Sequence, residues 1–256
     1  MSLRFASLGS GSRGNALVLE TSQVRVLIDC GFPAREVEAR LGRLGVDAQS
    51  LDAILVTHEH GDHIRGVGAM ARRYSLPVWM TAGTFRAGNL GEINQLQRID
   101  CHAGWFCLGD LEVLPFPVPH DAREPCQFMF QCRGLRLGLL TDTGHITPHI
   151  RENLQACDCL ALEFNHDIEM LANGPYPPRL RARVGGRHGH LSNAQSIELL
   201  SQLPIEQVRY LLACHLSEKN NSVERVRHAV LEELPSLEQR LRFACQDDVS
   251  GWFDLD

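Results

Sequence analysis

The sequence predicts an α/β protein in which two β-sheets pack together and helices cover their outer faces. Three observations predict this fold class. Short runs of β-branched and aliphatic residues occur in both halves of the chain, helical patterns lie between them, and no linker or shift in composition divides the 256 residues. We therefore expect one domain that extends over residues 1–256.

The first quarter of the chain is expected to form short strands joined by tight turns. The segment GSGSRGN at residues 9–15 follows the first strand and offers several positions able to adopt positive φ. A helix is expected from Pro33 onward, because proline suits the first helical turn and Val37 and Leu41 follow at helical spacing. The strands of this quarter are predicted at residues 3–8, 16–20, 24–29 and 52–57.

The remaining elements follow from the same two periodicities. The middle of the chain, residues 97–141, is dominated by short strands, and helical patterns return after it. Further strands are predicted at residues 76–80, 111–116, 127–132, 135–140, 159–164 and 208–214. Further helices are predicted at residues 64–74, 147–155, 193–203 and 222–234.

The composition is that of an ordinary globular protein, with 44% hydrophobic and 22% charged residues. No apolar run is long enough to span a membrane, and residues 1–5 do not begin a signal-peptide core, so we expect a cytoplasmic protein without a membrane partner. The nine cysteines lack zinc-finger spacing and are expected to be reduced and mostly buried. The net charge of −6 argues against indiscriminate nucleic-acid binding.

The strongest chemical signal is the segment THEHGDH at residues 57–63. Its three imidazoles and one carboxylate are donors that zinc and similar ions prefer. Because a buried strand is expected to end at the start of this segment, His58 and His60 can point the same way and share one ion. After the intervening glycine turn, Asp62 and His63 can face a second ion. The alternatives are a solvated polar loop and a purely structural single-metal clip.

The H-x-H-x-D-H string after a strand resembles the signature of the metallo-β-lactamase superfamily. The resemblance implies a four-layer αβ/βα sandwich of two mixed β-sheets. It also implies further ligands at later strand ends, in the order histidine, aspartate, histidine. The candidates, each after an apolar run, are His120, Asp142 and His215. Considered separately, an aspartate between two threonines more often forms a turn, and a lone histidine is more often a surface or core residue.

Carried over position by position, the resemblance implies two metal-binding sets that share one carboxylate. The first set is His58, His60 and His120, the second is Asp62, His63 and His215, and the shared bridging group is Asp142. A carboxylate suits the bridging position because each of its two oxygens can meet a cation. We expect two divalent ions, with zinc first and manganese or iron as the other choices, since imidazole and carboxylate suit all three.

Five further segments are more particular than the ligand string: GSGSRGN at 9–15, EFNHD at 163–167, NGPYP at 173–177, GHLSN at 189–193 and HLSEKNN at 215–221. They resemble the YycJ-type (WalJ) branch of the superfamily and, more loosely, tRNase Z. The branch implies a 5′-to-3′ exonuclease that acts on DNA. The tRNase Z likeness implies that His190 donates a proton or contacts a phosphate. Alternatively, His190 only precedes the cap of the helix that starts near Asn193.

The implied mechanism is hydrolysis of a phosphodiester by a hydroxide that bridges two cations, because the cations lower the pKa of a shared water. Asp62 would orient that water, and His190 would protonate the leaving oxygen. Two rival functions stay open. One is a small-molecule hydrolase of thioesters or lactams, similar to glyoxalase II, with a narrow apolar pocket. The other is a non-hydrolytic metal-binding protein.

A cluster of arginines precedes His190 and favours a phosphate-rich substrate. Its members are Arg179, Arg181, Arg183 and Arg187. We expect an extended segment whose alternating guanidinium groups line one side and pair with phosphates. The alternative is a solvated surface on which arginines serve solubility. The position of the cluster favours a nucleic acid, with DNA preferred, over a small neutral substrate.

Overall fold

The structure is a computed structural model that describes residues 3–255. The expectation about a signal peptide rests on residues 1–5, of which Met1 and Ser2 lie outside the described residues. The backbone divides into two compact units. The first contains the described residues of Met1–Pro117, Ala122–Leu135 and Ala244–Asp256, and the second contains Val118–Asp121 and Arg136–Phe243. The single domain expected from the sequence stays a prediction, and each unit is described by itself.

The first unit contains a seven-stranded mixed sheet with the order β14-β1-β2-β3-β4-β5-β6. The neighbours from β14 to β3 are antiparallel, and those from β3 to β6 are parallel. These strands are β14 (Phe253–Asp254), β1 (Arg4–Gly9), β2 (Ala16–Glu20), β3 (Arg25–Ile28), β4 (Ala53–Leu55), β5 (Val78–Thr81) and β6 (Leu96–Ile99). An antiparallel ladder in the same unit joins β7 (Phe106–Leu108), β8 (Leu111–Pro117) and β9 (Cys126–Cys132).

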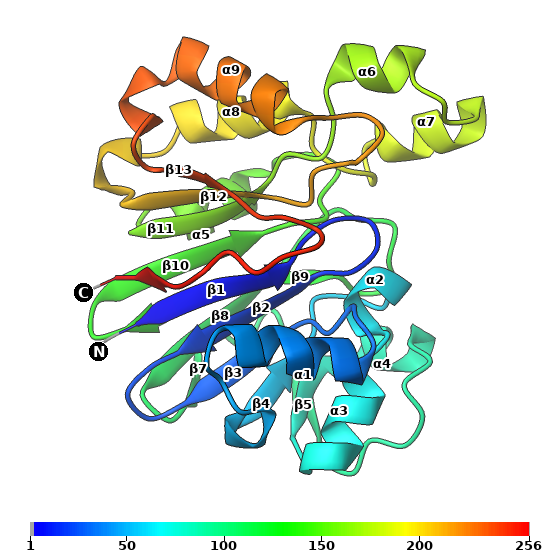
Figure 1. The fold of residues 1–256 in the computed structure, drawn as a ribbon, viewed down its shortest axis with the longest axis vertical. Coiled ribbons are helices and arrows are strands. Elements are labelled where there is room, and N and C mark those ends of the chain that lie inside the picture. Colours follow the sequence, from blue (N-terminus) through cyan, green and yellow to red (C-terminus); the bar gives the residue numbers. More distant parts are fainter. Residues whose placement is uncertain (1–2, 256) are drawn as a thin grey trace. The chain divides into compact units, whose positions relative to one another are not determined.

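Helices pack on this sheet through aliphatic side chains. Figure 1 shows α1 and α3, in blue and cyan, on one side of strands β3 to β5. Val37 and Leu41 of α1 and Met70 of α3 are fully buried in the same cluster as Ile54 of β4. Burial of each such side chain contributes roughly 1.5–3 kcal/mol. The helical segments of the unit are α1 (Ala34–Arg43), η1 (Ala48–Ser50), α2 (Gly61–Ile64), α3 (Val67–Tyr74) and α4 (Ala82–Ala87).

The second unit is built on parallel strands, with β11 paired to β10 and β12, and β12 paired to β13. The strands are β10 (Leu135–Leu140), β11 (Cys159–Glu163), β12 (Tyr210–Cys214) and β13 (Leu241–Phe243). The helical segments are α5 (Pro148–Leu154), α6 (Ile168–Asn173), α7 (Pro178–Val184), α8 (Asn193–Ser201), η2 (Ile205–Gln207), α9 (Val223–Glu233) and η3 (Pro235–Leu237). Because parallel strands share a carboxyl edge, residues that follow β10, β11 and β12 lie at the same edge.

Two expectations about helices need correction. The helix predicted at residues 64–74 is interrupted near Gly66, so that α2 and α3 are separate. The arginine segment is not extended: Arg179, Arg181 and Arg183 lie in α7, because Pro178 occupies the first helical turn and leucine, alanine and arginine are good helix formers, and Arg187 follows the end of this helix. In a helix, Arg179 and Arg183 share a face and Arg181 points elsewhere, so the arginines cannot form the expected single row.

Two expectations from composition can be compared with the described residues. Within 3–255, no helix combines the length and the apolar character needed to cross a membrane. All nine cysteines are free, and most are buried, as expected.

Candidate active site

In the first unit, the histidine segment follows β4 and continues into α2. The chain leaves β4 at Leu55, and His60 is the residue before the first turn of α2. The side chains of His58 and His63 are almost fully buried. The ring centroid of His58 lies 4.6 Å from that of His60 and 4.1 Å from that of His63. His58 Nε2 and His60 Nδ1 are 3.1 Å apart, close enough to bind one ion.

A buried carboxylate that the sequence analysis did not identify, Asp29, fixes this segment. It accepts hydrogen bonds of 2.8 Å from the backbone N–H of Thr57, from Thr57 Oγ1 and from His63 Nδ1. Because the Thr57 hydroxyl proton points to Asp29, His58 Nδ1, at 3.0 Å, donates to Thr57 Oγ1. The rings of His58 and His63 therefore carry their proton on Nδ1 and present a lone pair on Nε2. In the sequence, Asp29 could have been identified as a site residue because it directly follows an apolar strand.

The glycine-rich loop after β1 holds the Asp62–His63 turn. The Asn15 backbone N–H donates to Asp62 O at 2.8 Å, and Asn15 Nδ2 donates to His63 Nε2 at 3.2 Å. Gly31 lies so close that a Cβ there would be 1.7 Å from Asp62 O, so only glycine fits. The Asn15 amide is held in turn by Ser10 Oγ, which donates to its Oδ1 at 3.0 Å. The segment quoted for its family likeness thus has a structural role in placing Asp62.

In the second unit, four side chains with metal-ligating atoms gather at the carboxyl edge of the parallel strands. One ligand atom from each of Asp142, Glu163, His190 and His215 lies within 4.8 Å of those of the others. Glu163 is the last residue of β11, and His215 directly follows β12. Asp142 and His215 have left-handed backbones, with φ of 49° and 55°. Such conformations cost of order 1–3 kcal/mol for non-glycine residues and cluster at functional sites.

Glu163 anchors this cluster. Its fully buried carboxylate accepts hydrogen bonds from His190 Nδ1 at 2.8 Å and from His215 Nδ1 at 3.1 Å. It also accepts the backbone N–H groups of Thr143 and Leu191. Burial would raise the pKa of Glu163, but the facing His190 and the hydrogen bonds from both histidines outweigh burial and lower it to about 2. The carboxylate is therefore ionised and keeps the Nδ1 protons in place.

His120 belongs to the same unit and lies beside this cluster. Its Nδ1 donates to Gly189 O at 2.9 Å, and its Nε2 is 3.9 Å from Asp142 Oδ1. The rings of His120 and His190 are 5.3 Å apart. Asn165, in the segment that follows β11, donates from Nδ2 to His215 O at 3.1 Å and so fixes the backbone of that histidine.

The donor chemistry fits divalent metal ions. Histidines that bind metals usually donate their other ring N–H to a carboxylate or a carbonyl. Among the predicted ligands, His63 donates to Asp29, His215 donates to Glu163, and His120 donates to the carbonyl of Gly189. The structure thus brings the predicted ligands and the predicted catalytic histidine, His190, together in two groups, one in each unit. The first group is His58, His60, Asp62 and His63, and the second is His120, Asp142, His190 and His215. That both groups bind the same pair of ions stays a prediction.

The four arginines differ in their contacts. Arg183 pairs with the carboxylate of Asp121, with NH2 3.2 Å from Oδ1, and Arg181 NH1 donates to Ala172 O. Two of the four guanidinium groups are therefore tied to the protein surface. Arg179 and Arg187 are exposed.

The comparisons with known proteins identify the family and the fold. A family model described as a β-lactamase superfamily domain matches residues 24–215. The chain is 34% identical over 237 residues to the exodeoxyribonuclease YycJ of Bacillus anthracis, with 91% of this chain and 90% of that protein covered.

Two solved structures have the same fold at low identity. The metallo-β-lactamase fold protein YhfI of Bacillus subtilis has a TM-score of 0.76 at 15% identity, covering 97% of this chain and 99% of that one. The short form of human tRNase Z has a TM-score of 0.65 at 16% identity, covering 96% and 98%. These likenesses confirm the predicted metallo-β-lactamase fold. The chain therefore belongs to the metallo-β-lactamase superfamily, as a hydrolase related to the YycJ-type exodeoxyribonucleases.

Proposed function

We propose that this protein is a two-metal phosphodiesterase that removes nucleotides from DNA in the 5′-to-3′ direction. One observation carries the proposal: His190, a histidine beside predicted ligands, donates to a buried and ionised Glu163. A structural metal clip would not need this extra histidine. The printed name of the Bacillus anthracis relative, an exodeoxyribonuclease, supports DNA as the substrate.

The proposed ligand sets are those implied by the family signature. His58, His60 and His120 would hold one ion, Asp62, His63 and His215 would hold the other, and Asp142 would be shared by the two sets. When bound, the two divalent ions supply Lewis acidity and an activated water. The buried hydrogen-bond partners Asp29 and Glu163 keep the neutral ligand imidazoles of His63 and His215 in the tautomer protonated on Nδ1, which leaves the Nε2 lone pair available to an ion.

The protein's own groups then act on the substrate. His190 is only partly buried, with 15% of its side chain exposed, so a substrate can reach it. The hydrogen bond from Nδ1 to Glu163 holds the ring in place, and a proton on Nε2 can pass to the leaving oxygen. Asp62, whose side chain is 23% exposed, orients the attacking water. Arg179 and Arg187 meet the phosphates of the strand outside the site.

A panel of substrates tests the proposal. The protein is loaded with zinc, manganese or iron and incubated with 5′-phosphorylated duplex DNA, single-stranded DNA and RNA. We expect mononucleotides released progressively from the 5′ end of DNA. The variant Glu224→Gln, an exposed change on α9, is the matched control and should behave as the parent. Absence of cleavage with all three metals, together with rapid thioester hydrolysis, would overturn the proposal in favour of a small-molecule hydrolase.

A further inference from the structure

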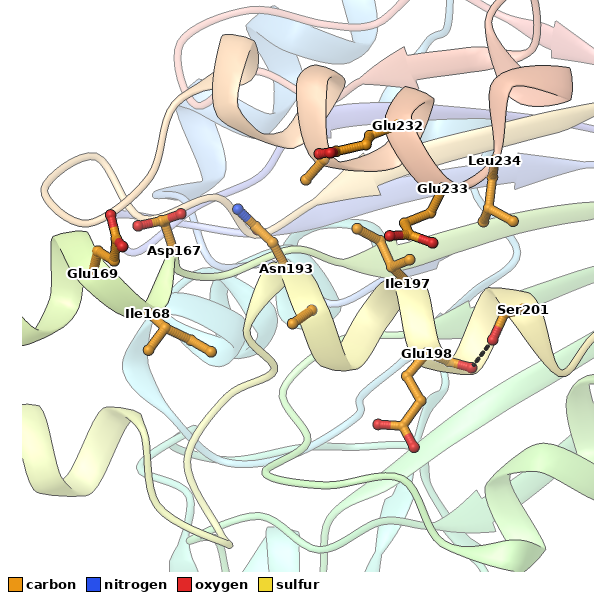
Figure 2. A pocket seen from close by; sticks show the side chains of 12 residues that line it. Asp167, Ile168, Glu169, Asn193, Ile197, Glu198, Ser201, Glu232, Glu233 and Leu234 are labelled. Atoms are coloured by element: carbon orange, nitrogen blue, oxygen red, sulfur yellow. Dashed lines mark hydrogen bonds between the residues drawn. The ribbon is translucent and has the colours of Figure 1, made fainter.

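Two cavities flank helix α8 in the second unit, and their chemistry differs. The first, of about 560 Å³, is an acidic cavity between α8 and α9, and Figure 2 shows its carboxylates. They belong to Asp167, Glu169, Glu198, Glu232 and Glu233. Because these groups repel phosphates, the acidic cavity does not suit a nucleic acid.

The second cavity, of about 660 Å³, has one acidic and one basic residue and an imidazole. We name it the histidine cavity; it is lined by His166, Ile168, Leu171, Ala172, Arg181, Gly185, Ser192, Ala194, Gln195 and Glu198. Its size is within the range of about 300–1,000 Å³ typical of ligand pockets. Aliphatic surface from α6 faces polar side chains from α7 and α8, a combination that suits a flat ligand with a polar edge.

The position of the histidine cavity relates it to the cluster around Glu163. His166 follows Glu163 by three residues, and Ser192 follows His190 by two. The two wall residues form an isolated parallel β-bridge, and Asn165 N donates to Leu191 O at 3.1 Å. The same two short segments therefore carry both the reacting groups and part of the cavity wall.

His166 has hydrogen-bonding capacity that the protein does not use. The residue is 3% exposed, and its Nδ1 is buried without a hydrogen-bond partner among residues 3–255. A buried polar atom of this kind costs free energy unless a ligand or water completes it. Burial lowers the pKa of His166 to about 4, so the ring is neutral near pH 7 and offers one donor and one acceptor. A neutral imidazole matches an uncharged ligand better than it matches a phosphate.

The other wall groups fit the same kind of ligand. Gln195 Oε1 accepts hydrogen bonds from the backbone N–H and the hydroxyl of Ser192 in the cap of α8, so its Nε2 is the end that a ligand can use. Arg181 is anchored by Ala172 O, and its planar guanidinium can stack on a ring or meet a flanking phosphate. Leu171 and Ile168 supply apolar surface for a ring face.

We propose that the histidine cavity binds the base of a nucleotide adjacent to the scissile phosphate, with the edge of the base on His166 and Gln195 and its face on Leu171 and Ile168. This inference rests on the proposed nuclease function. It assigns a base-binding subsite that positions a nucleic-acid strand. Every base has an apolar face and a polar edge, so the subsite accepts different bases. It binds an abasic position less tightly, because that position has no base.

A cavity-filling variant tests the subsite. The substrates are 5′-phosphorylated single strands that carry one abasic residue at the first, second or third position, and the intact strand. The readout is the ratio of kcat/KM for the intact strand to that for the abasic strand, so a general loss of activity cancels. In the parent we expect a ratio of about 10 at one position, since stacking of a base contributes roughly 1–3 kcal/mol.

The variant Ala172→Phe fills the histidine cavity from an exposed position of α6, and its ratio should fall to about 1. The matched control Ala229→Phe places the same ring at the acidic cavity on α9 and should keep the parent ratio. A ratio of about 1 at all positions in the parent, or a ratio unchanged in Ala172→Phe, would overturn the subsite. If the parent cleaves no strand, and also fails to hydrolyse bis(p-nitrophenyl) phosphate, which has no base, the proposed function itself fails.

A second variant separates binding from structure. His166→Phe keeps the ring shape and removes both nitrogens. Because Nδ1 has no partner in the protein, the Tm should stay the same or rise, while the intact-to-abasic ratio falls severalfold. A lower Tm with an unchanged ratio would show that His166 only supports the fold, and would overturn its assigned contact with the base.

Discussion

The two units hold their predicted ligands in different ways. In the first unit, four predicted ligand residues lie within six positions of the chain, and Asp29, directly after a neighbouring strand, fixes this segment. In the second unit, the ligand residues are up to 95 positions apart, from His120 to His215, and Glu163 joins two of the histidines. Ligands that are neighbours in the sequence therefore need one buried carboxylate to fix the orientation of their rings. Ligands that are far apart in the sequence also need the strands of a sheet to bring them to the same edge.

The largest expected effect comes from the residue proposed to touch both ions. Asp142→Ala should lose activity and at least one metal equivalent, because both ions lose a charged ligand. His58→Ala, in the other unit, should lose only one equivalent. Metal content by elemental analysis, with kcat/KM on a 5′-phosphorylated strand, checks the pair. If Asp142→Ala kept both metals, the bridging assignment would be wrong.

The next effect concerns chemistry rather than metal binding. His190→Ala should lower kcat by about 10²- to 10⁴-fold, the usual range for loss of a general acid. Metal content should stay at the parent value, which distinguishes this histidine from His120 and His215 in the same unit. Loss of metal in His190→Ala would instead make it a ligand and leave the leaving oxygen without its proposed proton donor.

The two anchors permit a direct comparison between the units. Glu163→Gln and Asp29→Asn keep the shape of each carboxyl group and remove its charge. Each should lower metal affinity or activity by about 10- to 100-fold, as other partners of metal-bound histidines do. We expect the larger loss for Glu163→Gln, because it accepts hydrogen bonds directly from two histidines, whereas Asp29 accepts one from His63 and acts on His58 only through Thr57. Equal losses would show that the number of anchored histidines does not matter.

The smallest effects are expected at the surface arginines of the second unit. Arg179→Ala and Arg187→Ala should each weaken duplex binding and reduce the slope of log K against log salt by about 0.9, the value for one phosphate contact. Arg183→Ala should change the slope less, because its guanidinium is paired with Asp121. Arg86→Ala, an exposed arginine of α4 in the first unit, is the control. An equal change in all four variants would remove the assigned role of these arginines.

The sequence by itself determined the features that depend on neighbouring residues. Periodicity located strands such as β2 and β10 at their observed bounds, and ligand chemistry singled out residues 57–63. The order of His120, Asp142 and His215 came from the family resemblance, and the matched family and fold confirm that resemblance. The arginine segment was predicted wrongly, because an alternation of arginines also fits a short helix once Pro178 starts it.

Only the tertiary structure decided which distant side chains meet. Asp29 lies 34 positions before His63, and Glu163 lies 52 positions before His215, yet each pair is joined by a hydrogen bond. The left-handed backbones of Asp142 and His215, and the unsatisfied Nδ1 of His166, are likewise invisible in a linear pattern. The physical reason is that strand order and register set such contacts, whereas the periodicity of a sequence reports only on the element that contains it.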